Sequence, residues 1–248
     1  DMGFKKTTKK LSSGTALPQN RGVCPVDSWK LRVAVSSAQF LKEIIIFSRD
    51  ELKQEQMRQR LNHSKIKFYI GDIRDRGSVD DAMTGVDYVF HAAALKQVPS
   101  CEFFPMQATQ TNVIGSQNVI SSAIQNGVAK VVSLSTDKAV YPVNALGITK
   151  ALMEKIVQSV SRNILKGQTI LTLVRYGNVL FSRGSVIPLF MKQIREKKPL
   201  TVTEPTMTRF LLPLPEAIQL VGFALEQGQQ GDIFVRKASS CTIGDIAK

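Results

Sequence analysis

Five short segments with strand character, separated by helical patterns, constrain the fold of this chain more than any other feature. They lie at residues 44–47, 66–70, 88–91, 131–134 and 170–175. The first, Ile44-Ile45-Ile46-Phe47, is continuously apolar, as expected of a strand buried on both faces of a sheet. Residues 50–61 between them form a charged helical segment, and residues 112–125 repeat apolar side chains at helical spacing. This alternation is typical of an α/β fold.

The segment from Ser133 to Lys155 contains the strongest signal of a functional site. Its apolar run ends at Leu134, and the polar run Ser135-Thr136-Asp137-Lys138 follows at once. Because ligands of parallel sheets bind beyond the strand ends, this position favours a binding or catalytic role.

A helix is predicted directly after that polar run. Pro142 cannot lie inside a helix and Asn144 is a good N-cap, so the helix is expected to begin near Ala145. Leu146 and Lys150 are four residues apart and therefore share one face of it.

A formal net charge of +13 narrows the class of ligand. The 248-residue chain is 43% hydrophobic and 21% charged, which is ordinary for a globular protein of one large or two small domains. The excess of basic residues fits a small anionic ligand, nucleic acid, or simply a basic tail and solvated faces. The basic residues are scattered, and no basic helix with interleaved aromatic residues occurs, so we expect no nucleic-acid partner.

The three cysteines, Cys24, Cys101 and Cys241, form no C-x-x-C pair and have no neighbouring histidine pair. We therefore expect neither a disulfide framework nor a metal site, which fits a reducing cytoplasm. No apolar run approaches the ~18 residues of a membrane span, and the first residues lack the apolar core of a signal peptide. No membrane partner is expected.

Seven motifs occur in a fixed order from about Lys42 to the end of the chain. They are HAAALKQVP (91–99), TNVIGSQNVI (111–120), LSTDKA (134–139), the helix with Lys150, VRYGNV (174–179), SRGSVIP (182–188) and MTRF (207–210). In these motifs the chain resembles the extended short-chain dehydrogenase/reductases, and within them the UDP-N-acetylglucosamine 4,6-dehydratases of bacterial polysaccharide and glycan synthesis. The resemblance implies a homo-oligomer and a Rossmann-like doubly wound parallel sheet. It also implies an NADP-binding domain over residues 41–180 and a small, partial substrate-binding lobe over residues 181–248.

Residues 1–40 depart from that family. Its members place a strand, a glycine-rich turn and a helix here, whereas residues 5–22 are polar and turn-rich and contain no G-x-G-x-x-G. Leu31 to Val35 has strand character, but only about eight residues separate it from Ile44, fewer than the ~10–12 that a crossover needs. Two explanations stay open: the first unit is lost or scrambled, or a dinucleotide is held in an unusual way. The ending at Gly244–Lys248 resembles a helix cut short, so a fragment is also expected.

The resemblance implies a set of cofactor-binding residues for NADP. Ser48 and Arg49 would hold the ribose 2′-phosphate, Asp72 would accept from the adenine amino group, and Ile73 would pack on the ring. The remaining members of the set are Ala92, Ala93, Ala94, Lys96, Lys150 and Tyr176. The alternatives are a surface turn at residues 48–49 and a helix cap at Asp72 or Asp75. His91 is expected to be a hydrogen-bonded core residue.

The resemblance also implies contacts with a UDP-sugar substrate. Asn178, Arg183, Ser185 and Arg209 occupy the matching positions, and a surface turn is the alternative for the last three. Most relatives have tyrosine in the place of Leu146, and that phenol takes the proton from the sugar hydroxyl. An apolar residue there is similar to the subgroup that inverts C5, which has methionine, or to an inactive copy.

The implied reaction oxidises sugar C4, removes the C5 proton, expels the C6 hydroxyl as water and returns the hydride to C6. Asp137 and Lys138 occupy the positions that act on C5 and O6, and Lys150 would supply positive charge near O4. With Leu146 apolar, we hypothesise that Thr136 relays the O4 proton together with Lys150. Tyr141 is a lesser choice.

Three classes of function therefore stay open from the sequence. The first is an NADP-dependent nucleotide-sugar dehydratase, with a plain 4-epimerase as the runner-up. The second is a catalytically impaired fragment or a non-catalytic nucleotide-sugar-binding relative, and the third, suggested by charge alone, is nucleic-acid binding.

Overall fold

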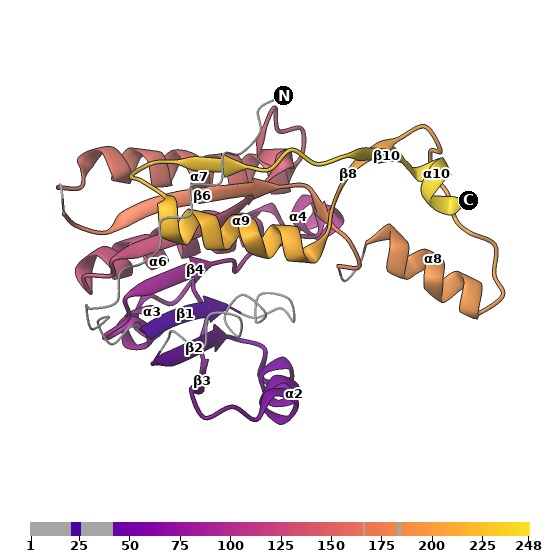
Figure 1. Cartoon of the computed structure of the whole chain (residues 1–248). Helices are drawn as coiled ribbons and strands as arrows, with labels where there is room; N and C mark the ends of the chain where they lie inside the picture. The colour runs from indigo at the N-terminus through magenta and orange to yellow at the C-terminus, as the bar shows by residue number, and fades with distance from the viewer. Residues whose placement is uncertain (1–20, 26–41, 166, 183–184) are drawn as a thin grey trace, which may run out of the picture.

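The computed structural model describes residues 21–25, 42–165, 167–182 and 185–248, and the main sheet contains seven parallel strands (Figure 1). Their spatial order is β3-β2-β1-β4-β5-β6-β9. The strands are β1 (Arg21–Pro25), β2 (Glu43–Ser48), β3 (Ile66–Ile70), β4 (Tyr88–His91), β5 (Lys130–Thr136), β6 (Ile170–Tyr176) and β9 (Ile233–Val235). Strand order reverses between β1 and β4, as in a doubly wound Rossmann-like sheet. The α/β fold class predicted from the sequence is confirmed.

Helices cover both faces of this sheet. The helical segments are α2 (Glu51–Leu61), α3 (Arg76–Met83), α4 (Val98–Phe103), α5 (Pro105–Thr109), η1 (Gln110–Ile114), α6 (Gly115–Gln125), η2 (Asp137–Ala139), α7 (Ala145–Asn163), α8 (Val186–Arg195), α9 (Leu214–Gln227) and α10 (Ile243–Ala247). Helices α3, α6 and α7 pack on one face, where Val119 and Met153 meet Val131 in one buried cluster. Helix α9 packs on the other face, where Val221 meets Val132 in a second cluster. The parallel strands are thereby buried on both sides.

A second, smaller sheet lies beyond the end of β6. It has three strands in the order β10 (Ser240–Thr242), β8 (Thr208–Leu212) and β7 (Asn178–Val179). Strand β8 is antiparallel to β10 and parallel to β7. This sheet leads to α8 and α10, which project to one side of the main sheet in Figure 1. Of these elements, β8, β10, α8 and α10 lie within residues 181–248.

Strand β1 corrects the prediction for residues 21–25. We expected a turn-rich leader there, whereas Arg21–Pro25 pairs in parallel with both β2 and β4, with Val23 opposite Ile45 and Val89. Residues 26–42 then separate β1 from β2, more than the ~10–12 residues that a crossover needs. Pairing with two neighbours outweighs the weak strand propensity of glycine and proline in this segment. The strand character at residues 31–35 lies outside the described residues.

The predicted helix after Asn144 is confirmed as α7. The Asn144 side chain accepts from Gly147 N at 2.8 Å, as an N-cap does. The helix predicted over residues 112–125 differs at its start, where η1 is a π-helical turn that continues into α6. At this turn the Asn112 amide accepts from Leu95 N at 2.8 Å and donates to Leu95 O at 3.0 Å. The π turn thus fastens the loop after β4 to the helix.

Three further expectations concern cysteines, metals and membranes. Among the described side chains, Cys101 and Cys241 are free thiols, and Cys101 is buried. No group of three or more potential metal ligands occurs in the part of the chain that the structure describes. The described helices include none with the length and apolar character to cross a bilayer.

Candidate functional site

A cavity of about 600 Å³ opens at the carboxyl ends of the parallel strands. It collects residues that follow β2, β3, β4, β5 and β6, and therefore surrounds the point where the strand order reverses. Open α/β sheets bind their ligands at this place. Most of the predicted site residues line it: Ser48, Arg49, Asp72, Ile73, Ala92, Ala93, Ala94, Lys96, Thr136, Lys138, Lys150, Tyr176, Asn178 and Ser185.

One end of the cavity lies between β2 and helix α2 and contains two cations. Arg49 is 56% exposed, and Lys53 forms an ion pair with Asp50 at 3.0 Å. Asp50 also caps α2 by accepting from Lys53 N, and Ser48 Oγ accepts from Asp50 N. The segment is therefore a helix start that also places two cations at the rim of the cavity.

Asp72, after β3, is engaged by two guanidinium groups. Its Oδ2 accepts from Arg49 Nη1 at 3.2 Å and from Arg74 Nη2 at 2.7 Å, and Oδ1 accepts from Arg74 N at 3.0 Å. Burial raises the pKa of Asp72, but these hydrogen bonds outweigh burial and hold the pKa below its ordinary value. Asp75, and not Asp72, caps helix α3 by accepting from Gly77 N and Ser78 N.

The middle of the cavity is lined by small and apolar side chains. Ala92, Ala93 and Ala94 follow β4 directly, and Ile73 is buried beside them on the cavity wall. Small side chains let an extended ligand approach the backbone. The predicted core role of His91 is confirmed, since its side chain is 2% exposed and its Nε2 lies 2.8 Å from Ser116 Oγ.

The opposite end of the cavity contains a hydrogen-bonded polar group at the end of β5. Thr136 Oγ1 donates to Asp137 Oδ1 at 2.8 Å, and Lys138 Nζ donates to the same carboxylate oxygen at 3.1 Å. Lys138 Nζ also donates to Asn178 Oδ1 at 3.4 Å. Side chains from β5, η2 and β7 therefore meet at one point, as a site for proton transfer requires.

Helix α7 contributes Leu146 and Lys150 to the same cavity, as their predicted common face requires. The Lys150 side chain is buried, and its Nζ donates to Leu134 O at 2.8 Å. Leu146 is buried against Cys101 and Ala108, so no hydroxyl is present at this place. Tyr141 is 92% exposed and is not among the described residues that line the cavity.

Two predicted substrate residues differ in position from the rest. Arg209 lies on β8, where its Nη1 donates to Thr208 O, and it is not part of the described cavity lining. Arg183 lies outside the described residues. Ser185 precedes α8 and lines the cavity, with its Oγ donating to Ser182 O at 2.6 Å.

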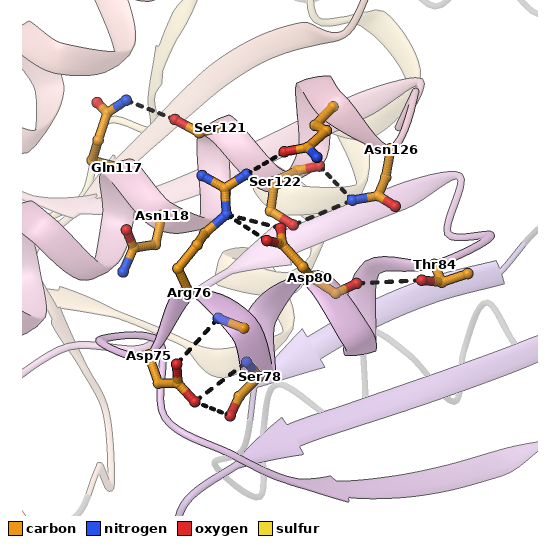
Figure 2. Close-up of polar contacts among 12 residues, drawn as sticks. Asp75, Arg76, Ser78, Asp80, Thr84, Gln117, Asn118, Ser121, Ser122 and Asn126 are labelled. Atoms are coloured by element: carbon orange, nitrogen blue, oxygen red, sulfur yellow. Dashed lines mark hydrogen bonds and ion pairs between the residues drawn. The ribbon is translucent and has the colours of Figure 1, made fainter.

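A polar network ties helix α3 to helix α6 (Figure 2). Arg76 Nε donates to both carboxylate oxygens of Asp80, and its Nη2 donates to Gln125 Oε1 at 2.7 Å. Asn118 of α6 donates to Ile73 O at 2.9 Å. These contacts hold the wall of the cavity in place. The interior of the cavity is lined by the residues described above.

The cavity residues fit an elongated dinucleotide better than a compact ligand. Cations lie at one end, small side chains in the middle, and a buried lysine with a threonine hydroxyl at the other end. Asp137 is hydrogen-bonded to that hydroxyl but is not among the described residues that line the cavity. The phosphate, the flat ring and the reactive ring of a dinucleotide need these three environments in this order.

Comparison with protein families identifies the chain by a match over most of its length. Residues 31–248 match the family described as "Polysaccharide biosynthesis protein". The chain belongs to this family.

Two proteins of Rickettsia are similar in sequence to most of this chain. A protein of Rickettsia typhi named UDP-glucose 4-epimerase is 64% identical over 208 residues, which are 84% of this chain and 61% of that protein. Its Rickettsia prowazekii counterpart, with the same name, is 63% identical over the same lengths. The chain thus spans about three fifths of the length of these relatives.

Solved structures that are similar to this chain have the same fold as it does. Pen from Bacillus thuringiensis superposes with a TM-score of 0.89 at 36% identity, covering 92% of this chain and 74% of Pen. DesIV from Streptomyces venezuelae, a dTDP-glucose 4,6-dehydratase solved with NAD bound, superposes with a TM-score of 0.82 at 20% identity, covering 92% and 79%. Both structures therefore share the α/β Rossmann-like fold of this chain.

The cavity of this chain also includes residues that were not predicted individually as site residues. Among them are Lys53, Gln97, Thr111, Leu134 and Ser182. Lys53 was detectable, because it follows the cap residue Asp50 by three positions and so lies on the first turn of α2. The others reach the cavity only through the packing of loops and helices, which no local pattern specifies.

Proposed function

We propose that this chain is an NADP-dependent lyase that removes water from a UDP-N-acetylhexosamine by 4,6-dehydration, with epimerisation at C5 at the same site. The observation that supports this most is the hydrogen-bonded group of Thr136, Asp137 and Lys138 at the end of β5. A base at C5 and an acid at O6 are needed for dehydration, and a carboxylate beside an ammonium group supplies both.

The proton from O4 needs an acceptor other than residue 146. Thr136 Oγ1 already donates to Asp137 Oδ1 at 2.8 Å, so a proton accepted from O4 by Thr136 has a direct route to the carboxylate. Lys150, buried on α7, adds a positive charge that stabilises the alkoxide as it forms. Thr136 with Lys150 therefore takes the place of the phenol that most relatives use.

The dinucleotide, when bound, would take a hydride from sugar C4 and return it to C6. Arg49 and Lys53 supply the positive charge that favours NADP at the adenosine end. The protein's acid and base remove the C5 proton, release O6 as water and return a proton to C5. The sugar loses one water, and the dinucleotide ends as it began.

A second function, 4-epimerisation, is favoured by the name of the Rickettsia relatives. It begins with the same oxidation at C4 but leaves C6 untouched. The polar group at residues 136–138 is richer than that reaction needs. Asp137 and Lys138 therefore favour dehydration.

The test is a reaction in heavy water with NADP⁺ and either UDP-N-acetylglucosamine or UDP-glucose, with the sugar products separated by chromatography and their masses measured by mass spectrometry. We expect the acetylated sugar to lose one water and to gain solvent deuterium at C5. Conversion of UDP-glucose without any change of mass would support the 4-epimerase instead. A folded chain that binds NADP⁺ and UDP but converts neither sugar would support a non-catalytic relative.

We also propose that the chain forms a homo-oligomer. Helices α4, α5 and α7 contact one another. Phe103, Met106 and Ile148 on these helices, and Phe104 between α4 and α5, are at least half exposed. Large apolar side chains gathered on neighbouring helices are typical of an interface between subunits. Light scattering of the purified chain is expected to give at least twice the monomer mass.

A further inference from the structure

The Asp72 carboxylate links two guanidinium groups that differ in their access to the cavity. Asp72 Oδ2 lies 3.2 Å from Arg49 Nη1 and 2.7 Å from Arg74 Nη2. Arg49 lines the cavity, whereas Arg74 does not belong to the described lining. A ligand in the cavity can therefore contact Arg49 directly, and Arg74 acts on that ligand only through Asp72.

Arg74 is held in its place from the opposite side by helices α5 and α6. Its Nη1 donates to Gln107 Oε1 of α5 at 2.9 Å. Its backbone carbonyl and that of Ile73 accept from Asn118 Nδ2 at 3.2 and 2.9 Å. A Cβ at Gly115 of α6 would lie 2.7 Å from Ile73 Cδ1, so only glycine permits this close approach. The loop is thus fastened, with Arg74 directed at Asp72.

The charges at this end of the cavity show what Arg74 contributes. Arg49 and Lys53 are positive, and each has a carboxylate partner, Asp72 and Asp50 respectively. These four charges sum to zero, and Arg74 leaves one net positive charge. A phosphate monoester has a charge of roughly −1.5 to −2 at neutral pH, so Asp72 without Arg74 would repel it and compete for Arg49.

We propose that Arg74 is a positioning residue that sets the preference of this site for a dinucleotide with a 2′-phosphate. It neutralises Asp72 and thereby leaves Arg49 available to the phosphate. The inference rests on the dinucleotide binding proposed above and extends it to a residue outside the cavity.

The experiment compares NADP⁺ and NAD⁺ binding to the full chain by calorimetry. In R74Q we expect the Kd for NADP⁺ to rise about tenfold and that for NAD⁺ to change less than about twofold. The matched control is R76Q, which removes the same charge two residues away. Arg76 contacts Asp80 and Gln125, not Asp72 (Figure 2), so the ratio of the two Kd values should stay unchanged.

A double variant tests the charge argument and guards against an effect of misfolding. If Arg74 acts by neutralising Asp72, then D72N removes the need for it. D72N/R74Q should therefore recover the NADP⁺ preference to within about threefold of the unaltered protein. Because Asp72 faces the part shared by both dinucleotides, the ratio of Kd values remains the correct readout.

The outcomes separate this inference from the function on which it rests. Equal weakening of NADP⁺ and NAD⁺ in R74Q, the same loss of preference in R76Q, or no recovery in D72N/R74Q would each overturn it alone. Failure of the unaltered, folded chain to bind either dinucleotide would overturn both the proposed function and the inference.

Discussion

Substitution of Gly147 by alanine tests how closely α7 supports the polar group after β5. A Cβ at this position would lie 2.2 Å from Lys138 O and 3.1 Å from Pro142 Cβ. The nearer atom belongs to the backbone, which must move by roughly 1 Å to reach an ordinary van der Waals separation. Because Lys138 follows Asp137 directly, that movement also displaces the carboxylate.

The magnitude follows from two opposing terms. Overpacking lowers the free energy of unfolding by about 1–3 kcal/mol, whereas replacing a helical glycine by alanine raises it by about 0.5–1 kcal/mol. We therefore expect G147A to lower the free energy of unfolding by about 1–2 kcal/mol, which corresponds to a fall in Tm of about 2–8 °C. A displacement of about 1 Å is expected to lower kcat by about 10²-fold.

Thermal unfolding and dehydratase turnover are the two assays, with G222A as the control. Gly222 lies within α9, and a Cβ there would meet no atom within 4 Å. G222A should therefore raise the free energy of unfolding by about 0.5–1 kcal/mol and leave turnover unchanged. If G147A matched the unaltered protein in both assays, or if G222A lost as much, the packing argument would be wrong.

Three further predictions test the site and its support. T136V is expected to lower turnover by about 10²–10⁴-fold and to leave NADP⁺ affinity unchanged, and full turnover would exclude Thr136 from the relay. E154A should cost about 3 kcal/mol of stability by urea unfolding, because it leaves the Arg175 guanidinium without its bidentate carboxylate; a loss below about 1 kcal/mol would contradict this. The lowered pKa of Asp72 means that its stabilisation relative to D72N is complete above the ordinary pKa of 3.8 and is lost as the pH falls through the lowered value. Tm values of both proteins between pH 7 and pH 3 should therefore converge in acid, and a constant difference would refute the assignment.

Local chemistry was sufficient to predict five of the seven strands of the main sheet, namely β2, β3, β4, β5 and β6. Strand Ile66–Ile70 and strand Tyr88–His91 have the bounds expected from the sequence, and α7 begins after the predicted cap, Asn144. These elements have strong local signals, namely an apolar run, a polar break and a capping side chain. The lining of one cavity by Thr136 and Lys150 likewise follows once strand ends and helix faces are known.

Long-range pairing explains what the sequence did not predict. Strand β1 contains Gly22 and Pro25, and only its two partners in the sheet make it a strand. The convergence of Arg49 and Arg74 on Asp72 joins residues up to 25 positions apart, and no spacing rule relates them. Tertiary contacts of this kind override or complement local propensity.

The central place of β1 has a consequence for the cooperativity of unfolding. In the main sheet, backbone hydrogen bonds between the half with β2 and the half with β4 pass through this five-residue strand. A dinucleotide that contacted both Arg49 and Lys150 would span the same boundary from the cavity side. Such a ligand would act as a non-covalent crosslink, so that two halves that open separately without it would unfold in a single transition when it is bound.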